Sequence, residues 1–190
     1  MLFRSGTALL FAVASGNAVA SIYYAQPLLG EMAGELGMSH ATIGVVTAVT
    51  QIGYGLGLLL VVPLGDLLNR RRLIGVQSLL SVLALIAVAL APTGTALLAG
   101  LAAVGVLAVL TQVLVAYAAS LAGPANRGRT VGIVTSGIVM GILLARTVSG
   151  TVADLAGWRA VYLVSAAATL VMAGLLFRTL PQRSDRKSVV

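Results

Sequence analysis

Six apolar segments of eighteen or more residues follow one another along the chain, and this pattern constrains the fold more than any other feature. A helix of that length crosses a hydrocarbon core of about 30 Å, and inside lipid only helices and closed barrels satisfy the backbone. Charged residues make up only 9% of the chain, against roughly 25% in a soluble domain. The sequence therefore predicts an all-α membrane protein whose six spans are residues 7–29, 41–64, 73–91, 95–121, 131–152 and 160–177.

Glycine, proline and charged residues predict where these spans are interrupted. The expected breaks are residues 27–30, 65–72, 92–94, 123–129 and 154–158. The first segment has an alternative interpretation, because Arg4, the apolar stretch 7–16 and Ala18-Val19-Ala20 resemble a signal peptide with its cleavage site. The apolar character continues to Leu29, which favours a span. We expect one six-helix transmembrane domain over 1–178, followed over 179–190 by a polar cytoplasmic tail or the start of a linker.

The distribution of Lys and Arg predicts the orientation, because short cytoplasmic loops are enriched in both. With a cytoplasmic N-terminus, ten of the twelve basic residues fall on the inside, Arg159 falls outside, and Arg146 lies within a span. The acids of the outer segments are Glu31, Glu35 and Asp154. We therefore expect a multi-pass protein of the cell (inner) membrane with both termini cytoplasmic.

Composition argues against several other functions. The net charge of +7 comes from short loops between spans, so it does not indicate nucleic-acid binding. The chain has no cysteine and a single histidine, His40, so no metal-ligand cluster is expected. No nucleophile–base arrangement indicates an enzyme, and no cofactor is expected. The expected partners are the lipid bilayer and a small-molecule substrate.

The segment PLGDLLNRRRLI, between spans two and three, combines an acid with three arginines. The three arginines alone can be explained as a topology anchor, because cytoplasmic loops are enriched in Lys and Arg. The spacing, however, resembles the loop motif G-x-x-x-D-[RK]-x-G-[RK]-[RK] of the major facilitator superfamily; the matching positions are Asp66, Asn69, Arg70 and Arg71. Val62 and Leu67 depart from the motif. Asn69 replaces a glycine, a mild change because asparagine tolerates a left-handed turn.

The same spacing recurs between spans five and six, 88 residues later, at Gly150, Asp154, Gly157 and Arg159. A motif repeated after three spans, on the opposite membrane face, is typical of the inverted 3+3 repeats that this superfamily nests in each six-helix half. The stretches SIYYAQPLLGEM and NRGRTVGIVTSGIVMGILLARTVSG resemble drug-efflux members, and the second contains the G-x-x-x-G pair Gly137–Gly141. The resemblance covers the chain but corresponds to the N-terminal six of twelve helices.

The resemblance implies roles for particular residues. Asp66 would be a gating latch that holds two halves together, with Arg70 and Arg71 as surface or lipid-facing partners. The alternative is a solvated acid beside anchoring arginines, and the latch requires a second half. Helices one, two, four and five line the substrate path in this superfamily. The candidate path residues on those helices are Asn17, Tyr23, Tyr24, Gln26, Gln51, Tyr54, Thr111, Gln112 and Tyr117. For each, the alternative is a hydrogen bond between helices.

Arg146 is the one charged residue well inside a span. An ionisable group in the membrane is by default a functional hypothesis. It could attract an anionic group of a substrate, pair with a carboxylate from elsewhere, or extend along the helix to the headgroups. The small or polar residues on its helix face, Thr135, Ser149 and Gly150, favour the bundle interior.

The sequence therefore predicts a secondary transporter of the efflux type, working by alternating access around a midplane site. No Asp or Glu lies in the middle of a span, which argues against autonomous proton antiport. A C-terminal half or a second copy of the chain would complete the bundle. The remaining alternatives are a non-transporting six-helix remnant and a homodimeric small permease.

Overall fold

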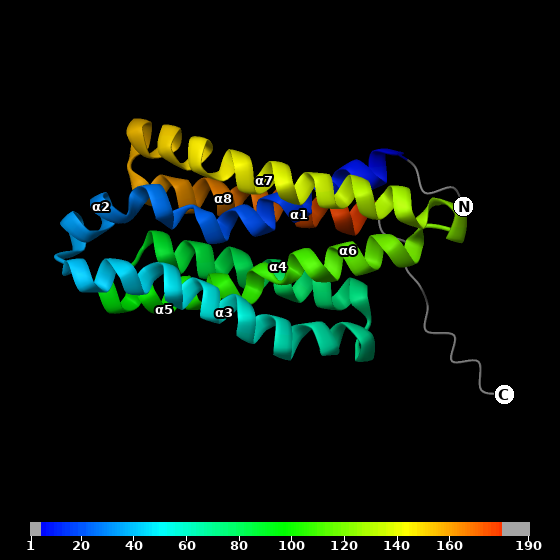
Figure 1. The fold of residues 1–190 in the computed structure, drawn as a ribbon, viewed down its shortest axis with the longest axis horizontal. Helices are drawn as coiled ribbons and strands as arrows, with labels where there is room; N and C mark the ends of the chain where they lie inside the picture. The colour runs from blue at the N-terminus through cyan, green and yellow to red at the C-terminus, as the bar shows by residue number, and fades with distance from the viewer. Residues whose placement is uncertain (1–4, 180–190) are drawn as a thin grey trace.

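The computed structural model describes residues 5–179, apart from the side chains of Ser5, His40, Ile43 and Asp66. Within this range the chain forms helices and no strand, and six helical segments are long and apolar enough to cross a membrane. They lie side by side along one long axis, and α1 begins at the same end of the bundle at which α8 ends (Figure 1). The predicted class, an all-α membrane protein of six spans, is confirmed. Residues 1–4 and 180–190, including Arg4 and most of the expected polar tail, lie outside the described range.

The first predicted span corresponds to two helices, α1 (Ser5–Tyr23) and α2 (Ala25–Leu36), and the stretch long and apolar enough to cross a membrane is Gly6–Tyr23. The predicted break at 27–30 is wrong, because α2 runs through it. The interruption lies at Tyr24 instead. Pro27 has no N–H to donate to the carbonyl four residues earlier, at Tyr23, so the helix is interrupted one turn before the proline. Helix α2 ends at Gly37, whose φ of 62° is the left-handed conformation of a helix C-cap.

The second and third spans are joined by two residues. Helix α3 (His40–Leu67) continues through Pro63, and α4 (Arg70–Ala89) begins inside the predicted break of 65–72. Asn69 does not adopt the expected left-handed turn: its φ is −61°, and its Oδ1 accepts hydrogen bonds from the N–H groups of Arg71 (3.0 Å) and Arg72 (3.4 Å). It is the N-cap of α4, a position that favours asparagine as strongly as the turn does.

The fourth span is also divided. Helix α5 (Gly94–Ala108) begins after Thr93, whose side chain caps it, and α6 (Leu110–Leu121) follows after an interruption at Val109. The buried Gln77 of α4 donates to the Leu107 carbonyl beside this interruption (3.1 Å). Gln77 therefore has a packing role between α4 and α5.

The last two spans are long helices joined by one glycine. A 3₁₀ turn, η1 (Pro124–Asn126), leads into α7 (Arg127–Ala156), and α8 (Trp158–Thr179) completes the bundle. Both helices extend beyond their predicted limits of 131–152 and 160–177. Gly157 alone separates them, with φ 79° and ψ 162°, a conformation that residues with a Cβ rarely adopt.

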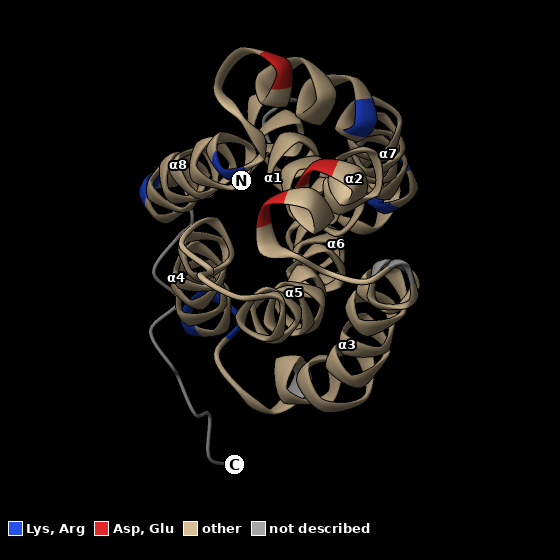
Figure 2. Ribbon diagram, turned by 90° about the vertical axis from the view of Figure 1, so that its left-hand side faces the viewer, with Lys and Arg blue, Asp and Glu red and all other residues tan. Residues whose placement is uncertain are grey.

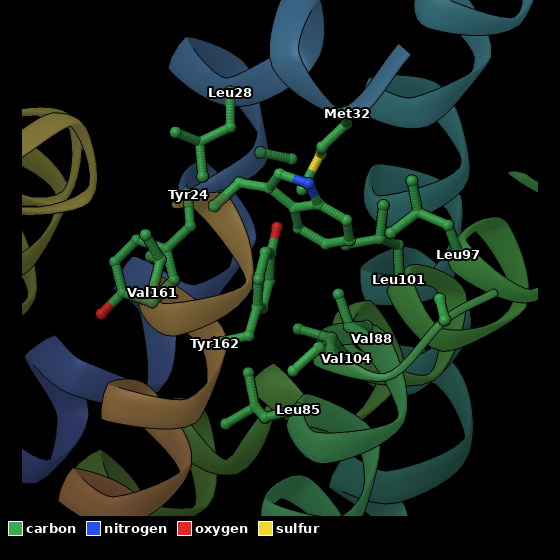
Figure 3. Packing of buried hydrophobic residues seen from close by; sticks show 14 of the residues in the cluster. Tyr24, Leu28, Met32, Leu85, Val88, Leu97, Leu101, Val104, Val161 and Tyr162 are labelled. Carbon is green, nitrogen blue, oxygen red and sulfur yellow. The ribbon is translucent and has the colours of Figure 1, made fainter. Parts of the chain in front are cut away.

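Three helix pairs make the most extensive contacts: α1 with α7 and α3 with α5, which run parallel, and α4 with α8, which run antiparallel. The largest buried cluster joins several spans, and Figure 3 shows its centre, where Tyr162 points between Tyr24 and the aliphatic side chains Leu85, Val88 and Val104. Tyr24 and Tyr162 meet edge to face, with ring centroids 6.3 Å apart. Because lipid is as apolar as leucine, this packing stabilises the bundle by van der Waals contact rather than by burial from water.

Glycines permit the two closest of these approaches. A Cβ on Gly16 would lie 2.5 Å from the Gly137 carbonyl oxygen of α7, and a Cβ on Gly141 would collide with the backbone of Gly16. The expected G-x-x-x-G pair is therefore a helix contact. Gly105 of α5 meets the backbone of Thr50 in α3 in the same way, so α1–α7 and α3–α5 are equivalent pairs in the two triplets.

Candidate substrate-binding face and its helix clasps

At the α3–α4 end of the bundle, arginines bind the carbonyls of other helices. Arg70 donates to the carbonyls of Gly65 (3.2 Å) and Ala116 (3.4 Å), and Arg71 donates to the carbonyl of Phe177 near the end of α8 (3.0 Å). The Arg71 guanidinium also lies 5.6 Å from the centre of the Phe177 ring. Cations are favoured at helix C-termini. These contacts join helices while both arginines stay partly exposed, so their expected role as surface or lipid-facing partners of Asp66 stays a prediction.

Asp66 belongs to the last turn of α3, but its side chain lies outside what the structure describes. Its proposed role as a latch thus stays a prediction. The neighbouring Arg71–Phe177 contact is called the α3–α4 clasp below.

At the opposite end, Arg159 makes a corresponding contact, the α7–α8 clasp. It donates to the carbonyls of Ala89 (2.6 Å) and Ala91 (3.1 Å) at the end of α4, and to Glu35 Oε1 from Nε (3.0 Å) and Nη2 (2.9 Å). Its guanidinium lies 4.4 Å from the centre of the Trp158 ring. Figure 2 looks onto this end, where acidic residues of α2 and α7 gather.

Glu35 joins α2 to this clasp. Trp158 Nε1 donates to Glu35 Oε2 (2.6 Å), and the Trp158 backbone N–H donates to Glu31 Oε1 (3.4 Å). The hydrogen bond from Trp158, followed by that from Arg159, holds the pKa of Glu35 below its usual value. The sequence predicts Glu31 and Glu35 in an outer segment but assigns them no role. Two features of the sequence indicate their contact: the two acids are four residues apart on one helix face, and a Trp-Arg pair follows Gly157.

The two clasps are related by the same 88-residue offset as the two motifs. Arg71 and Arg159 differ by 88 positions, and so do the residues whose carbonyls they bind, Ala89 and Phe177. Each arginine starts one helix of the α4–α8 pair and binds near the end of the other. This reciprocity supports the inverted 3+3 repeat. Gly150 and Asp154 are not part of this contact: Asp154 is exposed, and a Cβ on Gly150 would meet nothing within 4 Å.

Two hydrogen-bonded polar pairs lie on a surface between α7 and α3, which we call the central face. Arg146 Nη2 of α7 donates to Gln26 Oε1 of α2 (2.6 Å), and Gln112 Nε2 of α6 donates to the Tyr54 hydroxyl of α3 (3.1 Å). Both hydrogen bonds are solvent-exposed in the isolated chain. A small apolar cluster joins the two sides of the face; it comprises Val19, Ile22 and Ala108, against which Tyr23, Tyr54, Ile138 and Ile142 pack.

The other candidate path residues make contacts between helices. Asn17 Nδ2 donates to Thr169 Oγ1 of α8 (2.9 Å), and the buried Thr111 donates to the Ser15 carbonyl of α1 (3.3 Å). Tyr24 is buried against Tyr162, and Tyr117 packs edge to face on Phe11 at 6.1 Å. These residues fit the alternative of interhelical packing. Gln51 is exposed on α3, three residues before Tyr54, and its place on the substrate path stays a prediction.

A groove of about 600 Å³ does not include the polar pairs. It follows the contact of α1 with α7 and is mostly apolar, with Asn17 and Ser136 among its lining residues. Groove size alone therefore does not identify the central face.

Helices long enough to span a membrane, arranged as inverted triplets with polar pairs on one face, define a multi-pass membrane protein of the transporter type. The sequence profile of the Major Facilitator Superfamily matches residues 9–189, and the chain belongs to this family of transporters. The family agrees with the expectation that the chain is not an enzyme.

Three transporters illustrate the relationship. The chain is 44% identical to the uncharacterized transporter YgaY of Escherichia coli O157:H7 over 91% of its own length and 44% of that protein. It is 37% identical to the "Probable transporter SCO4007" of Streptomyces coelicolor over 86% of the chain and 38% of that protein. It is 26% identical to the uncharacterized MFS-type transporter YybF of Bacillus subtilis over 95% of the chain and 45% of that protein. The chain thus spans less than half the length of these relatives.

Proposed function

We propose that the chain forms one half-bundle of a secondary transporter that exports small molecules across the cell (inner) membrane by alternating access. The observation that carries the proposal is the central face, where the Arg146–Gln26 and Tyr54–Gln112 pairs lie on opposite sides of one cluster. Polar groups at this depth are costly on a lipid-facing surface, so a face that carries them is expected to line a water-filled path.

A second half-bundle would cover the central face and complete the path. Its source is either a C-terminal half, as the greater length of the relatives suggests, or a second copy of this chain. The Lys and Arg bias favours the α3–α4 end as cytoplasmic, which would place both termini inside. Asp66 at that end would then act on the second half as the latch.

Transport by reconstituted protein tests the proposal. Proteoliposomes containing the chain should accumulate a small-molecule probe more than protein-free liposomes do, and Asp66→Asn should reduce that flux. Leu83→Cys, an exposed change on α4 away from the central face, serves as the control and should leave flux unchanged. A folded protein that moves no probe at all, alone or with a co-expressed C-terminal half of YgaY, would favour the non-transporting remnant.

Cysteine crosslinking distinguishes a second copy from a separate half. The chain has no cysteine, so a single introduced thiol reports one position. Gln51→Cys on α3 should form an intermolecular disulfide in membranes if two copies meet through the central face, whereas Leu83→Cys on α4 should not. A strict monomer with both variants excludes the homodimeric permease.

A further inference from the structure

Arg146 lies at a depth in the membrane where its charge must be stabilised by neighbouring groups. Helix α7 is about 45 Å long, and Arg146 lies about 7 Å along the axis from its midpoint. The hydrocarbon core extends about 15 Å on either side of the bilayer centre, so the residue lies within it. A guanidinium remains charged in proteins, and it must therefore be compensated by a polar or charged partner.

The protein compensates this charge only in part. The guanidinium has five N–H donors, and within the part of the chain that the structure describes one side-chain hydrogen bond, from Nη2 to Gln26 Oε1, uses them. Among the residues that the structure describes, no carboxylate pairs with Arg146: Glu31 and Glu35 bind Trp158 and Arg159, and Asp154 lies at the end of α7. The backbone of Asp66 lies in the last turn of α3, about 18 Å along the helix from Tyr54.

The neighbouring polar groups also present donors to the face. Arginine has no acceptor, so the oxygen of the Gln26 amide must face Arg146 and its NH₂ group points elsewhere. The Tyr54 hydroxyl accepts from Gln112, which leaves its own hydrogen free to donate. Tyr54 is at the middle of α3, close to the depth of Arg146. A face that offers a cation and neutral donors, with no described acid beside them, is complementary to an anion.

We propose that the central face binds a small organic anion, a carboxylate or phosphate ester, with its charge on Arg146 and its apolar part on the partly exposed Tyr23, Ile138 and Ile142, which cover the buried Val19–Ile22–Ala108 cluster. The planar guanidinium can engage two oxygens of such a group at once. Gln26 positions the guanidinium and donates from its amide. The inference rests on the proposed transport function and assigns its substrate class: anions are accepted, and cations of the same shape are repelled.

Three probes with the same hydrocarbon body separate charge from hydrophobicity: 4-phenylbutyrate, 4-phenylbutylamine and 4-phenylbutanol. Binding to the purified chain is measured by calorimetry and by the thermal unfolding midpoint. We expect phenylbutyrate to bind at least tenfold more tightly than the amine or the alcohol. Arg146→Gln should abolish that preference and Arg146→Lys should restore part of it, because lysine keeps the charge without the fork. Arg129→Gln, an exposed change elsewhere on α7, is the matched control and should bind like the wild type.

Gln26→Glu gives a second test that keeps Arg146 in place. A carboxylate at position 26 would neutralise the guanidinium from within, so this variant should fold and lose phenylbutyrate binding. Equal binding of all three probes, preference for the amine, binding of none, or an unchanged anion preference in Arg146→Gln would each overturn the anionic site. Flux separates the two proposals: transport of the amine supports the transporter and refutes the anionic site. Anion binding without flux, also when the C-terminal half of YgaY is co-expressed, supports the site and refutes transport.

Discussion

The α7–α8 clasp predicts a specific loss of stability when Arg159 is replaced. Arg159→Gln removes hydrogen bonds to the Ala89 and Ala91 carbonyls, the pair with Glu35 and the contact with the Trp158 ring. The side chains of the ion pair are 34% and 49% exposed, so that pair contributes less than about 1 kcal/mol. The ring contact adds about 0.5–1 kcal/mol, and each carbonyl bond from the charged donor adds about 1 kcal/mol after allowance for exposure.

The expected total is a loss of about 2.5–4 kcal/mol, which lowers the thermal midpoint of a chain of this size by about 5–16 °C. The single tryptophan, Trp158, lies in the clasp, so its fluorescence follows unfolding in detergent or in nanodiscs. Arg159→Lys should recover less than half of the loss, because an ammonium cannot reach two carbonyls and a carboxylate with the same geometry. Arg129→Gln should melt with the wild type. A midpoint for Arg159→Gln within 1 °C of the wild type would refute the clasp as a stabilising contact.

Three further predictions use the same unfolding assay. Replacing Gly137 by leucine should destabilise the bundle by about 1–3 kcal/mol, because the side chain collides with the Ala12 backbone, whereas Gly132→Ala, where a Cβ meets nothing, should be neutral. Asn69→Ala should lower the free energy of unfolding by about 1 kcal/mol, because the α4 N-cap is lost. Asn69→Asp should keep most of that stability, because aspartate can also cap the helix; an equal loss in both variants contradicts the cap. The lowered pKa of Glu35 means that its contribution is full above the ordinary carboxyl pKa and is lost as pH falls through the folded value. The wild type should therefore lose its higher stability relative to Glu35→Gln on acidification below about pH 4.3. A stability difference that stays constant across that range contradicts the role given to the Glu35 carboxylate.

The spans and the repeat could be predicted from sequence because both depend on local chemistry. The length of an apolar segment identifies a membrane helix regardless of which helices it packs against. The 88-residue offset between Asp66 and Asp154 can be read directly from the residue numbers. Most helix ends extend beyond the predicted limits, because glycine and charged residues, which usually mark breaks, remain helical here. Inside a bundle, Gly65 and the first-turn arginines remain helical, since the cap at Asn69 and the carbonyls of other helices satisfy their polar groups.

The central face was less accessible to sequence reasoning. Arg146 was identified as unusual, but its partner Gln26 belongs to a helix that was expected to end near Pro27. Asn17 and Thr111 have the same polar character as Gln26 and Tyr54, and only the packing of α1 against α8 and α6 directs them inward. Which way a polar side chain points in an all-apolar helix is a tertiary property, because no amphipathic pattern marks the buried side.

The reciprocal arginines also couple the lengths of two helices to the thickness of the bilayer. Along α4 the distance from Arg71 to Ala89 is about 27 Å, and along α8 Arg159 and Phe177 are separated by the same number of residues. One inserted residue in either helix would turn its far end by about 100° and remove one acceptor from its arginine. The two clasps thus keep α4 and α8 equal in length, close to the roughly 30 Å of a hydrocarbon core, so this pair holds the half-bundle to a membrane of matching thickness.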